Sequence, residues 1–155
     1  MTLPELPPPT LVTDAAGLER LLAALGSVRE IAVDTEADSF YSYKEKVCLL
    51  QISVGERDFL VDPLSDLDLE RLGPVFADAR LTKVFHDGEY DISILKRDFG
   101  FQFANLFDTR VAAAALGMQA PGLAAVLSER FGVELDKSMQ RSNWATRPLT
   151  PRQIS

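Results

Sequence analysis

The chain has 155 residues, 46% of them hydrophobic, and a formal net charge of −7, which suits one globular domain and argues weakly against a nucleic-acid partner. Its single cysteine, Cys48, has no partner for a disulfide or a cysteine-ligated zinc site. We see no secretory signal and no apolar stretch of the roughly 20 residues that span a bilayer, so we expect a soluble cytoplasmic protein without a membrane segment, of unknown oligomeric state.

The first half of the chain predicts one helix and four strands. Residues 1–9 contain four prolines and form an expected Pro-rich leader. Residues 10–12 predict a short strand, and Thr13 or Asp14 is a suitable N-cap for a helix that ends near Leu25. The other strands are expected over residues 30–34, 47–54 and 58–61, the last two joined by a hairpin connection.

The second half alternates helices with short strands. We expect helices over residues 66–77, 89–99, 110–116 and 123–131, and strands over residues 83–85 and 106–107. Gly100 ends the second of these helices and Asp108 caps the third, while Thr150 followed by Pro151 predicts the start of a last helix. A strand hairpin followed by alternating helices and strands indicates an α/β domain with a mixed sheet.

Two carboxylates one residue apart, Asp34 and Glu36, end the apolar run of residues 31–33. Side chains at i and i+2 of a strand point to the same face, so these two lie side by side and repel each other. A divalent cation between them removes this repulsion, and Mg²⁺ and Mn²⁺ prefer carboxylate oxygens. The alternative is a strand that simply leaves the core through polar residues.

A second acidic segment covers residues 85–91, where a strand ends and a helix begins. Asp91 falls in the first turn of that helix, where the helix dipole alone favours a carboxylate, so a structural role is the alternative. His86 is the only histidine, and without clustered cysteines a tetrahedral zinc site is disfavoured. We find no serine-protease-type triad and no glycine-rich phosphate loop. Hard metals bound by carboxylates are what remains.

The ordered motifs resemble the ribonuclease D family of DEDD (DEDDy-type) 3′-5′ exonucleases. Residues 31–36 are similar to the first motif of this family and residues 48–53 to the strand that follows it. Residues 84–91 resemble the second motif, with Asp91 in the position of its metal-binding aspartate. Later similarities lie at Asp108-Thr109, Ser142-Asn143-Trp144, Arg147-Pro148-Leu149 and Gln153.

This resemblance implies a single 3′-5′ exonuclease domain over residues 1–155 with a ribonuclease H-like fold, a three-layer α/β arrangement of a central mixed sheet flanked by helices. It also implies two-metal hydrolysis of a terminal phosphodiester with Mg²⁺ or Mn²⁺. Asp34 is then expected to bridge both ions, Glu36 to hold the ion on the nucleophile side, and Asp91 to support the other. These three residues are the expected catalytic and metal-binding set.

The sequence departs from the family at its C-terminal end. The third motif of the family supplies a tyrosine and a last aspartate from the helix that begins here at Thr150, and the sequence stops at Ser155 before either residue. We therefore expect impaired catalysis, and one ion or none where a complete site holds two. A fragment of a longer nuclease is the favoured explanation, and a natural short protein that has lost catalysis is the alternative.

Substrate contacts are expected from Thr35, His86, Tyr41 and Arg147. Phe40, Tyr41 and Tyr43 follow the first motif and either stack a terminal base or cover the sheet edge. The expected partner is nucleic acid, RNA rather than DNA, with 3′ ends like those of transfer RNA. Two other functions stay open: a degenerate domain that binds nucleic acid or a protein without catalysis, and a hydrolase of small phosphate esters.

Overall fold

A six-stranded mixed sheet forms the centre of the computed structural model, which describes residues 7–154. The strands follow the order β1-β4-β3-β2-β5-β6 across the sheet. Their bounds are β1 (Thr10–Val12), β2 (Glu30–Ala37), β3 (Val47–Val54), β4 (Arg57–Val61), β5 (Thr82–Phe85) and β6 (Leu106–Asp108). Pairing is antiparallel between β2, β3 and β4 and parallel elsewhere. The predicted mixed sheet is confirmed, while most of the predicted leader lies outside the described residues.

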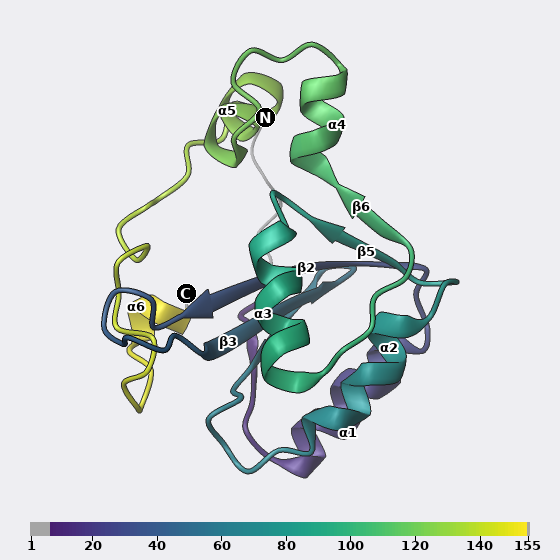
Figure 1. Ribbon diagram of the computed structural model, residues 1–155, viewed down its shortest axis with the longest axis vertical. Helices are drawn as coiled ribbons and strands as arrows, with labels where there is room; N and C mark the ends of the chain where they lie inside the picture. The colour runs from purple at the N-terminus through teal and green to yellow at the C-terminus, as the bar shows by residue number, and fades with distance from the viewer. Residues whose placement is uncertain (1–6, 155) are drawn as a thin grey trace.

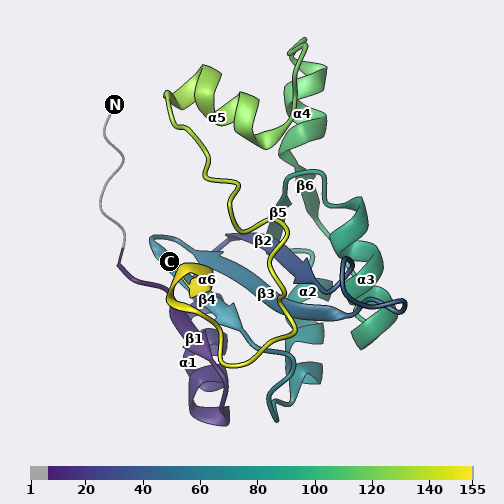
Figure 2. The same cartoon turned by 90° about the vertical axis from the view of Figure 1, so that its left-hand side faces the viewer.

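Helices lie on both sides of this sheet, as Figures 1 and 2 show. They are α1 (Ala15–Leu25), the 3₁₀ helix η1 (Leu69–Leu72), α2 (Gly73–Ala77), α3 (Glu89–Phe99), α4 (Thr109–Ala115), α5 (Leu123–Phe131) and α6 (Pro151–Ile154). Helices α4 and α5 project from one end of the molecule, away from α1 and α2 (Figure 1). Within residues 7–154, no helix is long and apolar enough to cross a membrane.

The main core lies between one face of the sheet and helices α1 to α3. Leu18 and Leu21 of α1, Phe76 of α2 and Leu95 of α3 are buried there against β2, β3 and β4. Helix α1 begins as predicted, because the side chain of Asp14 accepts the N–H of Gly17 at 2.7 Å. Burial of one leucine face and a satisfied N-cap therefore fix this helix against the sheet.

Two elements differ from the prediction by more than one residue. The single helix expected over residues 66–77 is wrong, because η1 ends at Leu72 and a new helix begins at Gly73. Pro74 has no N–H to continue the earlier turns and suits the first turn of α2. Strand β2 runs to Ala37 rather than ending at Asp34, because β3 continues to pair with it beyond that residue.

A smaller apolar cluster covers part of the opposite face of the sheet. Trp144 and Leu149 of the C-terminal segment are buried there with Cys48, Leu49 and Leu60. The rest of this face carries every second residue of β2, whose side chains point away from the main core. The C-terminal segment crosses this side of the sheet in Figure 2. The fold thus leaves the polar side of β2 open beside a covered region.

Candidate metal centre

Asp34 and Glu36 lie on the open side of β2. The strand alternates, so that Ile31, Val33 and Thr35 are buried while Asp34 is exposed and Glu36 is half-buried. Protein atoms nevertheless surround both carboxyl groups on most sides. Burial and the neighbouring Asp91 raise the pKa of Asp34 to about 6, and burial with the charges of Asp34 and Asp91 raises the pKa of Glu36 to about 8.

Asp91 joins this pair from the first turn of α3. Its side chain is 8% exposed, and its Oδ1 accepts the backbone N–H of Thr35 at 3.1 Å and the Thr35 hydroxyl. Burial raises the pKa of Asp91, although the bonds from Thr35 act in the opposite direction. The structure therefore brings together all three carboxylates that the sequence singled out.

These carboxylates suit a hard cation without forming a closed cage. Their donors are all oxygens, and burial together with the neighbouring carboxylates raises the pKa values of Asp34 and Glu36, two effects that a bound cation would oppose. However, in the part of the chain that the structure describes, no group of three or more acidic, histidine or cysteine residues is arranged to hold a metal ion. Oδ1 of Asp91 accepts two hydrogen bonds from Thr35. The centre is an open all-oxygen site.

A tight turn between β5 and α3 sets the position of Asp91. Asp87 has a positive φ of 62°, and Gly88 follows, where an added Cβ would lie 2.4 Å from the Cβ of Phe85. The Asp108 carboxylate accepts the N–H of Asp87 at 3.0 Å and that of Gly88 at 2.8 Å. From the sequence, Asp108 was expected to cap α4, and Asp108-Thr109 resembled a later marker of the family. Its second role has no local signal, because it depends on β5 and β6 being neighbours.

The centre continues into a pocket of about 290 Å³ that contains His86. Asp34, Gln51 and Thr109 also line this pocket. Nδ1 of His86 lies 2.8 Å from Oγ1 of Thr109, and Nε2 is buried without a hydrogen-bond partner among the described residues. His86 therefore shares this pocket with Asp34, with Nδ1 held by Thr109 and Nε2 buried without a partner among the described residues.

Tyr41 and Arg147, like Thr35 and His86, have hydrogen-bond partners within the chain. The Tyr41 hydroxyl donates to the carbonyl of Arg141 at 2.8 Å. Arg147 places its N–H groups on the Asp62 carboxylate and on the carbonyls of Cys48, Trp144 and Thr146. In this conformation all five N–H donors of that guanidinium are engaged. The guanidinium therefore holds the C-terminal segment, and its substrate contact stays a prediction.

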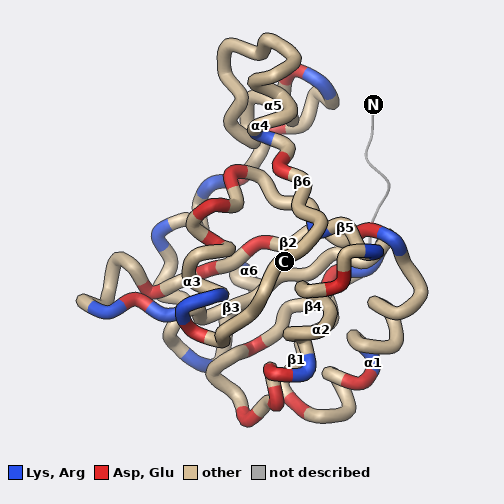
Figure 3. The backbone as a smooth tube through the Cα atoms, turned by 45° about the vertical axis from the view of Figure 1, so that its right-hand side comes forward, with Lys and Arg blue, Asp and Glu red and all other residues tan. Residues whose placement is uncertain are grey.

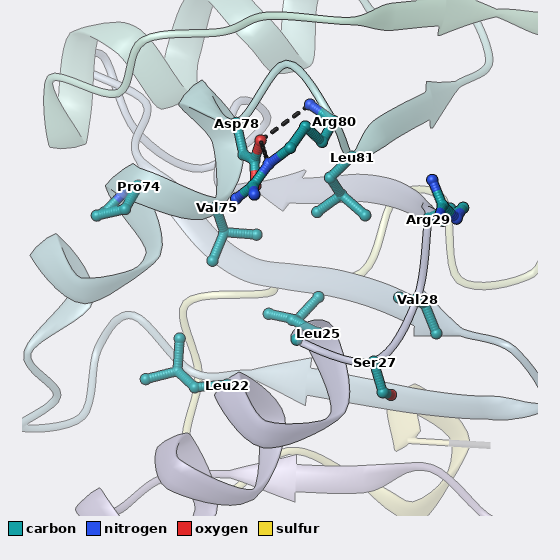
Figure 4. A pocket seen from close by; sticks show the side chains of 11 residues that line it. Leu22, Leu25, Ser27, Val28, Arg29, Pro74, Val75, Asp78, Arg80 and Leu81 are labelled. Atoms are coloured by element: carbon teal, nitrogen blue, oxygen red, sulfur yellow. Dashed lines mark hydrogen bonds and ion pairs between the residues drawn. The ribbon is translucent and has the colours of Figure 1, made fainter.

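A larger hollow lies elsewhere and lacks this chemistry. It measures about 550 Å³ and lies between α1, α2 and the segments that follow them (Figure 4). Its lining is mainly apolar, with Leu22, Leu25, Val75 and Leu81 among its residues. The one carboxylate in the lining, Asp78, is bonded to Arg80. Size alone therefore does not identify the reactive site.

Basic and acidic residues are both spread along the chain. Figure 3 shows basic and acidic positions interspersed along the backbone. The net charge of −7 therefore does not describe any one surface. Recognition of a charged substrate has to be argued from the residues around the centre.

Comparisons with known proteins point to one family. A family model described as 3′-5′ exonuclease matches residues 9–155. The exosome complex exonuclease RRP6 of Saccharomyces cerevisiae is 40% identical over 143 residues, which is 92% of this chain and 20% of that protein. The catalytic core of RRP6 from Trypanosoma brucei has a TM-score of 0.90 at 37% identity, covering 99% of this chain and 43% of that one.

A bacterial structure gives the same result. RNase D of Escherichia coli, described as an exoribonuclease involved in structured RNA processing, has a TM-score of 0.86 at 35% identity. The match covers 94% of this chain and 39% of that one. The present chain thus spans less than half the length of each of these three proteins.

Proposed function

Because this chain belongs to the 3′-5′ exonuclease family that includes RRP6 and ribonuclease D, we propose that it carries the hydrolytic centre of an exoribonuclease that removes nucleotides from RNA 3′ ends. Its fold is the ribonuclease H-like α/β fold of these enzymes, as the sequence predicts. The observation that carries the proposal is the convergence of Asp34 and Glu36 of β2 with Asp91 of α3.

We assign Asp34, Glu36 and Asp91 as the ligands of Mg²⁺ or Mn²⁺, because their oxygen donors suit hard cations. Such ions, when bound, lower the pKa of an attacking water and stabilise the leaving oxygen of the phosphodiester. Thr35 holds Asp91 in place through two hydrogen bonds. His86 lines the adjoining pocket and is the proposed substrate contact there, and Tyr41, a second proposed contact, lies on the loop that follows β2.

We further propose that the 155-residue chain is a weak catalyst that holds one ion or none. Three carboxylates are a short ligand set for two ions, and the described residues form no closed group around one. RNA is favoured over DNA because E. coli RNase D is described as an exoribonuclease. Structured 3′ ends like those of transfer RNA and a cytoplasmic location remain predictions.

A second candidate is a domain that binds nucleic acid without hydrolysing it. The specific observation in its favour is that Oδ1 of Asp91 already accepts two hydrogen bonds from Thr35, which leaves this carboxylate only Oδ2 for a metal ion. A non-catalytic domain needs RNA binding alone. Hydrolysis separates the two candidates.

The test is hydrolysis of a 5′-labelled single-stranded RNA with a 3′ hydroxyl in Mn²⁺ or Mg²⁺. We expect slow, stepwise release of nucleoside monophosphates from the 3′ end and its loss in Asp34→Asn. Asp66→Asn, at an exposed carboxylate remote in sequence from the three ligands, is the matched control. Hydrolysis that persists unchanged in Asp34→Asn contradicts the proposal, and RNA binding without any hydrolysis favours the second candidate.

A further inference from the structure

The first residues of α4 contact the turn that leads to Asp91. Strands β5 and β6 are parallel neighbours, so the end of β6 lies beside the end of β5, where that turn begins (Figure 1). The side chains of residues 108–110 bind residues 85–88. The turn before α3 is therefore held by a segment that lies 20 to 24 positions later in the sequence.

Asp108 uses its two carboxylate oxygens differently. Oδ1 accepts the N–H groups of Asp87 at 3.0 Å, Arg110 at 2.8 Å and Val111 at 3.3 Å. Oδ2 accepts the N–H of Gly88 at 2.8 Å. Burial would raise the pKa of Asp108, but these N–H groups lower it overall. One carboxylate therefore caps α4 and also holds the turn.

Thr109 holds the same turn through its hydroxyl. The hydroxyl donates to the carbonyl of Phe85 at 3.1 Å, and its oxygen lies 2.8 Å from Nδ1 of His86. Because a hydroxyl has one proton to donate, Nδ1 is the donor of the second hydrogen bond. Neutral His86 is therefore the Nδ1–H tautomer, and its Nε2 carries no proton. One side chain thus fixes both the end of β5 and the imidazole ring.

The position of this turn is transmitted to the Asp91 carboxylate. Asp91 follows Gly88 by three residues and lies in the first turn of α3. Its Oδ1 accepts the backbone N–H of Thr35 at 3.1 Å, across the gap between α3 and β2. A shift at the start of α3 changes the length of this bond. The Thr35 amide therefore reports the position of Asp91 without any metal ion.

We propose that Asp108 and Thr109 are positioning residues of the metal centre, because they hold residues 85–88 and thereby keep the Asp91 carboxylate against β2. This inference rests on the proposed function, in which that carboxylate binds a cation together with the two carboxylates of β2. Residues that orient metal ligands from outside the coordination sphere typically change metal affinity by about tenfold or more.

Four variants separate this role from general stability. Asp108→Asn keeps Oδ1 for the cap of α4 and replaces Oδ2 by an NH₂ group, which cannot accept the N–H of Gly88. Thr109→Val removes the hydroxyl with little change of shape, whereas Thr109→Ser retains it. Arg110→Ala is the matched control, because its exposed ion pair with Asp87 reaches the same turn and such pairs contribute little.

The first measurement is amide hydrogen exchange by NMR, in chelator. In Asp108→Asn and Thr109→Val we expect the Thr35 amide to exchange about fivefold faster or more. The Asp62 amide, which bonds to β1 on the far side of the sheet, should stay within about twofold. Thr109→Ser and Arg110→Ala should leave both rates within about twofold.

Two further measurements test the ring and the cation. Because His86 is the only histidine, the nitrogen-15 shifts of its ring identify the tautomer directly. We expect a single Nδ1–H tautomer in the unmodified chain and a mixture in Thr109→Val. Electron paramagnetic resonance of Mn²⁺ should show its Kd rising about threefold or more in Asp108→Asn and staying within about twofold in Arg110→Ala.

Equal acceleration of the Thr35 and Asp62 amides in Asp108→Asn overturns the positioning role, because it reports a loss of overall stability alone. An unchanged Thr35 amide or an unchanged Kd for Mn²⁺ in this variant also overturns it. An Nε2–H tautomer in the unmodified chain overturns the part assigned to Thr109.

Failure of this inference is distinguishable from failure of the proposed function. Hydrolysis that stops in Asp34→Asn, while the Thr35 amide is indifferent to Asp108→Asn, removes only the positioning role. Selective acceleration of the Thr35 amide in a chain that neither binds Mn²⁺ nor hydrolyses RNA retains the hold on Asp91 and removes the cation and exonuclease assignments.

Discussion

Thr35 and Asp91 are joined by two hydrogen bonds across 56 positions of sequence. The backbone N–H of Thr35 lies 3.1 Å from Oδ1 of Asp91, and the Thr35 hydroxyl donates to the same oxygen. This contact connects β2, which carries Asp34 and Glu36, with α3, which carries the third carboxylate. Thr35, which lies between Asp34 and Glu36 in β2, therefore aligns the third carboxylate, that of Asp91.

Replacing Thr35 by valine tests this alignment. The variant keeps the shape of the side chain and removes the hydroxyl, so Asp91 loses one donor in a buried place. Because hydrogen bonds to charged groups contribute more than neutral ones, we expect the free energy of unfolding in urea to fall by about 1–3 kcal/mol. Thr35→Ser keeps the donor and is expected to lose less. A loss in Thr35→Ser that equals or exceeds the loss in Thr35→Val would contradict this role of the hydroxyl.

The turn before α3 is a second test, through Gly88→Ala. A Cβ at this position would lie 2.4 Å from the Cβ and 2.6 Å from the Cγ of Phe85, so the turn or the ring must move. Overpacking of this kind typically costs about 1–3 kcal/mol, and movement here also displaces Asp91. Gly122→Ala is the matched control, because nothing lies within 4 Å of its added Cβ. The midpoint temperature of thermal unfolding and the rate of RNA hydrolysis should both fall in Gly88→Ala. Both should stay nearly unchanged in Gly122→Ala.

Local patterns account for most of the elements and for the three carboxylates. The i, i+2 spacing of Asp34 and Glu36 and the first-turn position of Asp91 are local features, and residues 89–99 form the predicted helix. The split at Gly73 was missed because the leucine and phenylalanine spacing of residues 66–77 looks continuous despite Pro74. Contacts between distant segments, such as those of Arg147, depend on strand order, which no local pattern contains.

Arg147 and Asp62 form an ion pair that fixes the C-terminal segment to β3 and β4. Nε and Nη2 of Arg147 lie 2.7 and 2.8 Å from the two Asp62 carboxylate oxygens, and the Asp62 side chain is 8% exposed. Burial alone would raise the pKa of Asp62, but the bonds from Arg147 and nearby N–H groups lower it overall. Stability from this carboxylate is therefore present above its ordinary pKa of 3.8 and is lost as the pH falls through its lower folded value.

We expect Arg147→Ala to lower the free energy of unfolding by about 3–5 kcal/mol, because it leaves a buried carboxylate without its cation. Arg110→Ala is the control. Arg110 pairs with Asp87 at an exposed position, where such pairs contribute about 1 kcal/mol or less. Urea unfolding at neutral pH measures the free energy of unfolding of both variants. Similar decreases in Arg147→Ala and Arg110→Ala would contradict a larger contribution from the Arg147–Asp62 pair.

The last prediction concerns the pH dependence of stability without divalent ions. Folding raises the pKa of Glu36 from 4.5 to about 8 and that of Asp34 from 3.8 to about 6. Between these values the folded chain retains protons that the unfolded chain has lost, so stability falls as the pH rises. In chelator we therefore expect the free energy of unfolding to decline from pH 5 to above pH 8. The decline between about pH 6 and 8 should be smaller in Glu36→Gln.

Divalent ions should reverse this trend, because a cation bound by the ionised carboxylates stabilises only the folded chain. Added Mn²⁺ is expected to raise the midpoint of thermal unfolding more at pH 8 than at pH 5.5, where protons compete for Asp34 and Glu36. Glu129→Gln, at an exposed glutamate of α5, should retain both the decline in chelator and the response to Mn²⁺. A decline that Glu36→Gln leaves intact, together with no shift in Mn²⁺ at pH 8, would show that the carboxylates of β2 do not form a cation site.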